Sequence, residues 1–524
     1  MTARPWRSAL HGRRQADALA VARDVAARLA DSRRLAVAFA AAGAQTDLPE
    51  ALRWRSYSVA AGDAGLALMC GYADRSSGQR GWDVSAHRFL ETAVRGLERD
   101  AEPDWGLFAG VGGLAFAADV LGREQHRYGR LRAALHAGLA PEATRMADRL
   151  RHPAPPGPVT SFDLVSGAGG IAAVLLRSDP HGALPGVLAG LTSLADTADG
   201  LPRWWTPPEF SDPAATGRCP GGNLNCGLAH GVPGPLAVLS LALTAGSEVP
   251  GQRRAVRTMA EWLLAHRVED RWGVDWPAFV HTPADVRAPA DVRAPASGRG
   301  PADVRAPADV RAAADVRGPA GGRPAPDGRA AVGTPAVQVL PHAVAPPAES
   351  AAPAGPDGSP APAAERPDGE RIRAGRAAWC YGSPGVARAL WHAGEALDDR
   401  RLRVAALEAM AAVLRRPPPL RGLDSPTLCH GLAGLLQIVL RFRHDTRADE
   451  SSVAAEFSVA AESLVDQLLD AYEPDRPMAF TALERAGMPV DRAGLLDGAS
   501  GVAMSLFAAS TAAEPVWDRL LLLS

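Results

Sequence analysis

The chain has 524 residues, of which 47% are hydrophobic and only 5% are aromatic, and its formal net charge is −2. This composition suffices for a large core, and the near-neutral charge excludes a long-range field that attracts nucleic acid or anionic lipid. Nothing near the N-terminus resembles a signal peptide, and no apolar run of about 18 residues predicts a membrane span. Five cysteines are too few for a disulfide scaffold, so we expect a protein of the reducing cytoplasm.

A G-x-x-G pair that opens a short apolar stretch recurs seven times along the chain. Apart from one longer gap, consecutive pairs are about 48 to 67 residues apart, which is the spacing of a repeat architecture. The seven pairs are Gly62/Gly65, Gly110/Gly113, Gly167/Gly170, Gly231/Gly234, Gly382/Gly385, Gly431/Gly434 and Gly498/Gly501.

The stretches between the glycine pairs predict amphipathic helices, with apolar residues at i, i+3, i+4 and i+7. The stretches after the glycines are apolar nearly all round and predict buried helices. An alternating series of this kind buries all its apolar faces by closing into a ring. The sequence therefore predicts an all-α fold, an α/α toroid of seven inner and seven outer helices with the glycine loops at one end.

The longer gap between the fourth and fifth pairs contains a segment of different composition. From 283 to 370 the chain is mainly Ala, Pro, Gly, Arg and Asp, with "ADVRAP" repeated. Such a segment cannot bury enough apolar surface to offset backbone ordering, about 1–2 kcal/mol per residue. We expect a disordered insertion at 283–370, with repeats 1–4 of the toroid in 1–282 and repeats 5–7 in 371–524.

Side chains that can bind a metal are concentrated before the glycines of three successive repeats. His230, Tyr381 and His430 directly precede the first glycine in repeats four, five and six, and Cys380 and Cys429 lie one position earlier. A single cysteine is more often a packing residue, but two at matched positions with a histidine favour zinc. Three protein ligands leave one coordination position open, as in catalytic zinc sites.

The other cysteines share no such position. We expect them to be ordinary reduced thiols: Cys70, Cys219 and Cys226.

Four sequence blocks carry a family resemblance: "RAAWCYGSPG", "LCHGLAG", "NCGLAHGVPG" and "LLDGASG". They resemble the signature blocks of the LanC-like lanthionine cyclases, and the resemblance covers nearly the whole chain outside the insertion. It implies an α/α toroid with one Zn²⁺ per chain, bound by Cys380, Cys429 and His430. It also implies a precursor peptide as substrate, in which Ser and Thr have been dehydrated to dehydroalanine and dehydrobutyrine.

The resemblance implies a Michael addition, in which a substrate thiol at the zinc attacks the β-carbon of a dehydro residue. His230 matches the acid/base histidine of the family and would protonate the resulting enolate. Asp163 would help to deprotonate the thiol or orient the histidine, and Arg376 would steady the enolate or a peptide carbonyl. Trp379 and Tyr381 flank a metal ligand and would orient it and exclude water.

Simpler interpretations stay open for three charged residues. Asp163 could cap a helix N-terminus, and Arg376 could be a surface cation. Asp497 shares the position before the first glycine in the seventh repeat, and we expect it only to cap the helix that follows.

We expect the dehydrated precursor peptide as a partner, together with a separate dehydratase, because the region before the toroid is too short to be one. An exporter is a further candidate partner. Two alternative functions stay open: addition of glutathione or another small thiol to dehydrated residues, and a non-catalytic zinc scaffold in a modification complex. Some other α/α toroids are zinc-dependent prenyltransferases or glycosidases, but a glycosidase needs a carboxylate pair, for which the sequence offers no strong candidate.

Overall fold

The computed structural model describes residues 4–46, 53–123, 127–151, 156–178, 182–211, 219–282, 364–365, 371–372, 376–446, 451–483 and 488–524. Most of the expected insertion, 283–370, lies outside these residues, so its disorder stays a prediction. Its one described element is strand β7 (Ala364–Glu365), which pairs antiparallel with β8 (Arg371–Ile372). In the described part of the chain, no helix is long and apolar enough to cross a membrane.

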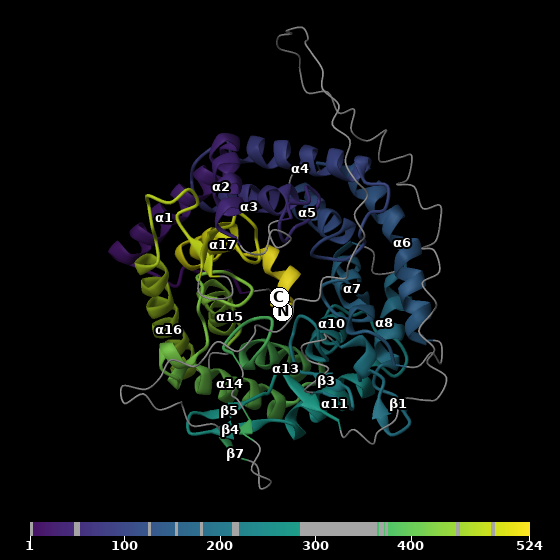
Figure 1. Cartoon of the computed structure of the whole chain (residues 1–524). Coiled ribbons are helices and arrows are strands. Elements are labelled where there is room, and N and C mark those ends of the chain that lie inside the picture. Colours follow the sequence, from purple (N-terminus) through teal and green to yellow (C-terminus); the bar gives the residue numbers. More distant parts are fainter. Residues whose placement is uncertain are drawn as a thin grey trace.

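Seven helices form an inner ring, and each begins between the two glycines of one of the seven pairs (Figure 1). Each inner helix packs against the next one along the chain, and the last, α17, packs against the first, α3, which closes the ring. The inner helices are α3 (Asp63–Ser76), α5 (Val111–Arg123), α7 (Ala168–Ser178), α10 (Pro233–Thr244), α13 (Ser383–Leu397), α15 (Leu432–Asp445) and α17 (Ala499–Ser510).

Seven outer helices surround this ring, which confirms the predicted α/α toroid. Six of them follow their inner partner in the chain: α4 (Trp82–Arg99), α6 (Gly129–Arg151), α8 (Leu184–Ser193), α11 (Gln252–Ala265), α14 (Arg400–Arg415) and α16 (Ser451–Asp470). The seventh is α1 (Gly12–Ala30), which packs against α17. The first and last helices of the toroid therefore form one pair. A further helix, α2 (Ser32–Gln45), packs against strand β10.

Short antiparallel strand pairs and single-turn 3-10 helices connect the helices. The strand pairs are β1 (Thr197–Ala198) with β2 (Leu201–Pro202), β3 (Asn223–Asn225) with β6 (Phe279–His281), β4 (Val268–Asp270) with β5 (Gly273–Asp275), and β9 (Thr481–Leu483) with β10 (Pro489–Asp491). The 3-10 helices are η2 (Val159–Ser161), η3 (Pro208–Phe210), η4 (Pro418–Leu420) and the longer η7 (Val516–Leu521).

The C-terminal segment with η7 lies in the centre of the ring (Figure 1). Trp517 is fully buried there, and Asp518 forms an ion pair with Arg441 of α15. Arg388 of α13 donates a hydrogen bond to the carbonyl oxygen of Leu523. The ring therefore has no open lumen at this level, and the core continues through its centre.

The second glycine of each pair lies where an inner helix starts against its own preceding loop. A Cβ atom there would lie 2.0–2.9 Å from the carbonyl oxygen of the residue six positions earlier, in all seven repeats. In repeat six, for example, a Cβ on Gly434 would lie 2.0 Å from the oxygen of Leu428. Since real Cβ atoms do not approach carbonyl oxygens so closely, only glycine permits this turn.

A closed belt of backbone hydrogen bonds, 2.7–3.3 Å long, joins the seven glycine loops. Each bond runs from an amide in one loop to a carbonyl in the next loop around the ring. The bonds are Val59 to Phe108, Leu107 to Val165, Leu164 to Ala229, Ala229 to Cys380, Cys380 to Cys429, Cys429 to Leu496 and Leu495 to Ala60. The belt fixes residues that directly precede the glycines at neighbouring places on one end of the toroid.

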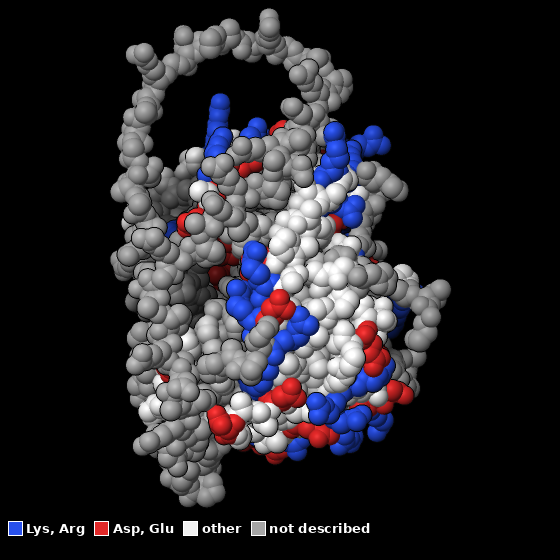
Figure 2. All heavy atoms as spheres, turned by 90° about the vertical axis from the view of Figure 1, so that its right-hand side faces the viewer, with Lys and Arg blue, Asp and Glu red and all other residues white. Residues whose placement is uncertain are grey.

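All the basic side chains of the chain other than histidine are arginine, since the sequence contains no lysine. On the face formed by outer helices such as α6, arginines appear together with acidic side chains (Figure 2). On α6, Arg145 and Arg149 both contact Glu142, and Arg151 contacts Asp148. This mixture agrees with the near-neutral net charge.

Candidate functional site

The three predicted metal ligands come together at the glycine-loop end of the toroid. Ligand atoms of Cys380, Cys429 and His430 all lie within 4.8 Å of one another. The belt explains this proximity, because the Cys380 amide donates to the Cys429 carbonyl and so aligns the two loops. The residues come from successive inner-helix loops, as their matched positions in the repeats predict.

The donor set fits a zinc ion. Two sulfurs and one imidazole nitrogen are zinc ligands of catalytic sites, where a fourth position stays open. A hydrogen bond with Cys380, followed by burial and the charge of Cys380, raises the pKa of the Cys429 thiol well above its ordinary value. Two thiolates so close together thus disfavour each other, and a divalent cation between them would remove that penalty.

The other three cysteines differ from this pair in their exposure. Cys380 and Cys429 are partly exposed, whereas Cys70, Cys219 and Cys226 are buried, and all five are free thiols. Burial raises the pKa of Cys70 and of Cys226 to about 12. Cys219 contacts His281, with 3.4 Å between Sγ and Nδ1. None of these three belongs to the metal-ligand cluster.

His230 and Asp163 form a hydrogen-bonded pair in the two loops that precede the cysteine loops. His230 Nδ1 lies 2.6 Å from Asp163 Oδ2, and the carboxylate is fully buried. The other oxygen, Oδ1, accepts hydrogen bonds of 2.8 Å from the amides of Ser166 and Gly167. Asp163 therefore fixes the loop before α7 and contacts the histidine, but it does not cap α7, because Ser166 and Gly167 both precede the helix, which begins at Ala168.

Tyr381 lies between this pair and the two cysteines. Its ring centroid is 6.2 Å from that of His230, and Asn225 of β3 donates a 3.0 Å hydrogen bond to its hydroxyl. Burial is the main cause that raises the pKa of Tyr381, and the charges of Asp163, Cys380 and Cys429 add to it. The hydroxyl therefore keeps its proton at neutral pH.

Sequence reasoning missed the role of Asn225. Its side-chain oxygen accepts a 2.8 Å hydrogen bond from the Gly227 amide, which leaves the amide nitrogen to hold Tyr381. A Cβ on Gly227 would lie 2.7 Å from the Tyr381 ring, so this glycine also makes room for the tyrosine. Asn225 begins the motif N-x-G-x-A-H-G, and that motif was the available signal.

Trp379 is buried, and its indole contacts the core behind Cys380. Its Nε1 donates a 2.9 Å hydrogen bond to the carbonyl oxygen of Leu521, and its ring lies 5.7 Å from that of Phe108. The C-terminal segment in the ring centre thereby anchors the residue next to a predicted ligand.

Arg376, four residues before Cys380, forms a 3.1 Å ion pair with Asp424 and is partly exposed. Its positive charge opposes the rise in the pKa of Cys429, which places it electrostatically close to the cysteines. Arg376 is therefore more than an isolated surface cation.

Asp497 does not cap α17 through its side chain, contrary to expectation. The residue at the cap position is Gly498, which has no side chain to form a cap hydrogen bond. Instead Asp497 Oδ1 lies 3.5 Å from Nδ1 of His430, a predicted metal ligand. The contact is electrostatic only, because Oδ1 has no hydrogen-bond partner in the described part of the chain.

Comparisons with known proteins agree with this geometry. Residues 53–289 and 363–522 match the family described as lanthionine synthetase C-like protein. A stretch of 96 residues is 31% identical to nisin biosynthesis protein NisC of Lactococcus lactis subsp. lactis, and it spans 18% of this chain and 22% of that relative. The structure of nisin cyclase aligns with a TM-score of 0.59 at 19% identity, over 92% of this chain and 95% of the other, which shows the shared fold.

Proposed function

Because the chain belongs to the family of lanthionine synthetase C-like proteins, we propose that it is a zinc-dependent lanthipeptide cyclase. Its substrate would be a dehydrated precursor peptide, in which it forms lanthionine and methyllanthionine thioether rings. The observation that carries the proposal is the cluster of Cys380, Cys429 and His430, within 4.8 Å of one another, beside the His230–Asp163 pair.

Zinc at Cys380, Cys429 and His430 would lower the pKa of a substrate thiol and so supply a thiolate near neutral pH. The thiolate sulfur forms a bond to the β-carbon of dehydroalanine or dehydrobutyrine, and the electrons of the C=C bond pass to the α-carbon and its carbonyl. A proton then adds to the α-carbon. The net reaction adds S–H across C=C and needs no oxidant.

His230 is the proposed proton donor. Since Asp163 occupies Nδ1, the other nitrogen, Nε2, is the one left to face a substrate. The buried carboxylate also fixes the orientation of the imidazole, as in other His–Asp pairs of enzymes. Arg376 and the Tyr381 hydroxyl are the proposed groups that steady the enolate oxygen or a peptide carbonyl.

The proposal includes a separate dehydratase that supplies the substrate and an exporter that takes the product. The five free thiols agree with a reducing compartment, and we propose the cytoplasm.

The test is an assay of the purified protein with a dehydrated peptide that contains cysteine. Free thiols are counted by alkylation and mass spectrometry, with and without glutathione. We expect the wild type to remove alkylatable thiols without a change in peptide mass, and His230→Ala to do so far more slowly. A mass gain equal to glutathione would instead indicate small-thiol addition.

His136→Ala is a matched control, because His136 also pairs with a buried aspartate, Asp119, at 2.9 Å but lies on outer helix α6. It should cyclise like the wild type. If thiols persist equally with the wild type and with His230→Ala, the cyclase proposal is wrong.

A further inference from the structure

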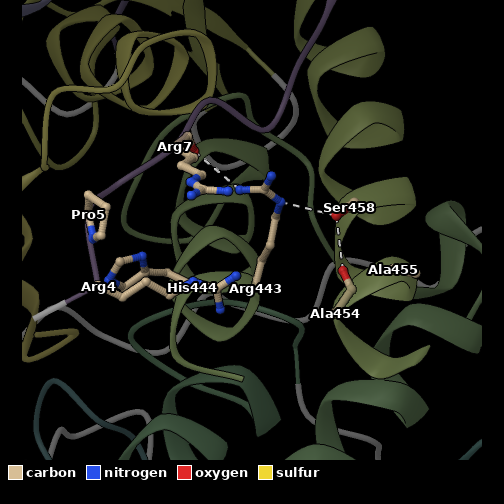
Figure 3. Close-up of a pocket in the computed structure, with 8 residues that line it drawn as sticks. All are labelled: Arg4, Pro5, Arg7, Arg443, His444, Ala454, Ala455 and Ser458. Atoms are coloured by element: carbon tan, nitrogen blue, oxygen red, sulfur yellow. Dashed lines mark hydrogen bonds between the residues drawn. The ribbon is translucent and has the colours of Figure 1, made fainter. Parts of the chain in front are cut away.

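A pocket of 230 Å³ lies at the end of α15 that is remote from the glycine loops (Figure 3). Three arginines line it together with His444 and the first turns of α16. Arg4 and Arg7 come from the segment before α1, and Arg443 lies in the last turn of α15. Because α15 has 14 residues, this pocket is about 20 Å along the helix from His430. It is therefore distinct from the candidate metal site.

Neutral oxygen atoms hold the Arg443 side chain in place. Its Nε donates to the hydroxyl of Ser458 at 3.0 Å, and its two terminal nitrogens donate to the carbonyls of Arg7 and Ser8 at 3.2 and 3.1 Å. A guanidinium group has five N–H bonds, so these contacts leave two for a ligand. The group is thus fixed in orientation and still able to donate.

The positive charges of the pocket have no acidic partner among its described lining residues. Arg4 donates to the carbonyl of Thr446 at 3.3 Å. Asp445 pairs with Arg388 and lies 4.0 Å from Nε2 of His444, but it forms no ion pair with the three arginines. Burial, together with the charges of Arg4 and Arg7, lowers the pKa of Arg443. The partly buried Arg443 therefore lies near two exposed arginines of like charge, and a bound anion would offset their repulsion.

The ordinary explanation for such an arginine is the helix dipole, since a cation in the last turn of a helix is stabilising. This explanation accounts for Arg443. It does not account for Arg4 and Arg7, which come from a different segment and bring their charges to the same place.

We propose that this pocket binds a phosphate group, either as free phosphate or in a phosphate monoester, through Arg4, Arg7 and Arg443. Arginine is suited to phosphate because its planar N–H groups form paired, charge-assisted hydrogen bonds with phosphate oxygens. A phosphate bound here ties the segment before α1 to α15 and α16, and so strengthens the closure of the ring.

The test is a titration of the purified full chain, in buffer free of phosphate and sulfate, by isothermal titration calorimetry. One arm uses inorganic phosphate and the other O-phospho-L-serine, so that free phosphate and a monoester are distinguished. We expect a dissociation constant of about 1 mM or lower for at least one probe. Arg7→Gln and Arg443→Gln should each weaken binding about tenfold to a hundredfold.

Arg13→Gln is the matched control, because Arg13 is a highly exposed arginine of α1 outside the pocket. It should bind both probes like the wild type. Arg7→Gln is the more informative variant, because the Arg443 side chain also anchors the backbone of the N-terminal segment and its loss could affect folding.

Two results would overturn the proposal: a wild type that binds neither probe, and arginine variants that bind as tightly as the wild type. Neither result depends on cyclase activity, so both leave the proposed function to its own test.

Discussion

The glycine loops of repeats one to three and those of repeats four to six have the same backbone contacts but different side chains. All of them join the same belt of hydrogen bonds. In all of them the second glycine lies so close to a carbonyl oxygen that a Cβ atom would not fit. Directly before the first glycine, however, the early repeats have Ala61, Ala109 and Ser166, where the later ones have His230, Tyr381 and His430. The comparison teaches that the scaffold and the chemistry are encoded by different positions of the repeat.

Removal of a metal ligand in the later loops should have the largest effect on zinc content and on the cyclisation rate. We expect Cys380→Ala and Cys429→Ala each to lose stoichiometric zinc and to lower the cyclisation rate by about a thousandfold or more, because the thiol is no longer activated. Zinc is measured by mass spectrometry of the intact protein, and the rate by thiol counting. Cys226→Ala, which removes a buried thiol outside the cluster, should retain both; zinc retained by either ligand variant would point to other ligands.

Loss of the proposed proton donor, His230, should lower the cyclisation rate without removing the metal. We expect His230→Asn to lower the cyclisation rate by about 10²- to 10⁴-fold, as is typical for removal of a general acid, with unchanged zinc content. Asp163→Asn should lower it in the same direction, because the imidazole loses the carboxylate at Nδ1. A parallel loss of zinc in His230→Asn would mean that His230 acts on the metal site instead.

A glycine substitution should reveal what the two sets of loops share. Gly434→Ala in repeat six and Gly113→Ala in repeat two should each destabilise the protein by about 1–3 kcal/mol, because the new Cβ overlaps a carbonyl oxygen. Denaturant unfolding measures this change. Only Gly434→Ala should also weaken zinc binding, since its loop carries two of the ligands. Equal zinc affinity in both variants would contradict the separation of scaffold from chemistry.

The smallest expected effect concerns the seventh repeat. Asp497→Asn should weaken zinc binding by about tenfold, since loss of a carboxylate beside a metal-bound histidine typically costs 10- to 100-fold and the contact here is electrostatic and long, at 3.5 Å. Competition with a chelator measures this affinity. Asp424→Asn, which removes a different carboxylate near the site, is the control, and equal affinities in the two variants would rule out a special role for Asp497.

The sequence was sufficient to predict the toroid and the cluster of Cys380, Cys429 and His430. Repeats that superpose place residues of equal position at one end of the ring. Residues at matched positions of neighbouring repeats are therefore expected to lie close together. The His230–Asp163 contact followed only from the family resemblance, because Asp163 occupies a different position in its repeat.

Other features could not be predicted, because they depend on contacts between distant parts of the chain. Asn225 reaches Tyr381 across 156 residues, and the indole of Trp379 reaches the carbonyl of Leu521 across 142. The pairing of α1 with α17 is of the same kind. No local pattern marks such partners, since periodicity reports which face of a helix is buried but not what covers it.

The pairing of the first and last helices has a consequence for biosynthesis. On the ribosome, α1 emerges long before α17, the inner helix with which it pairs, which is complete only when residues 499–510 have been translated. Until then, each nascent intermediate exposes an unsatisfied apolar surface at both ends of an open arc. Because such surfaces invite aggregation and contacts of this sequence separation form slowly, the last step of folding is also the one that most needs protection by chaperones.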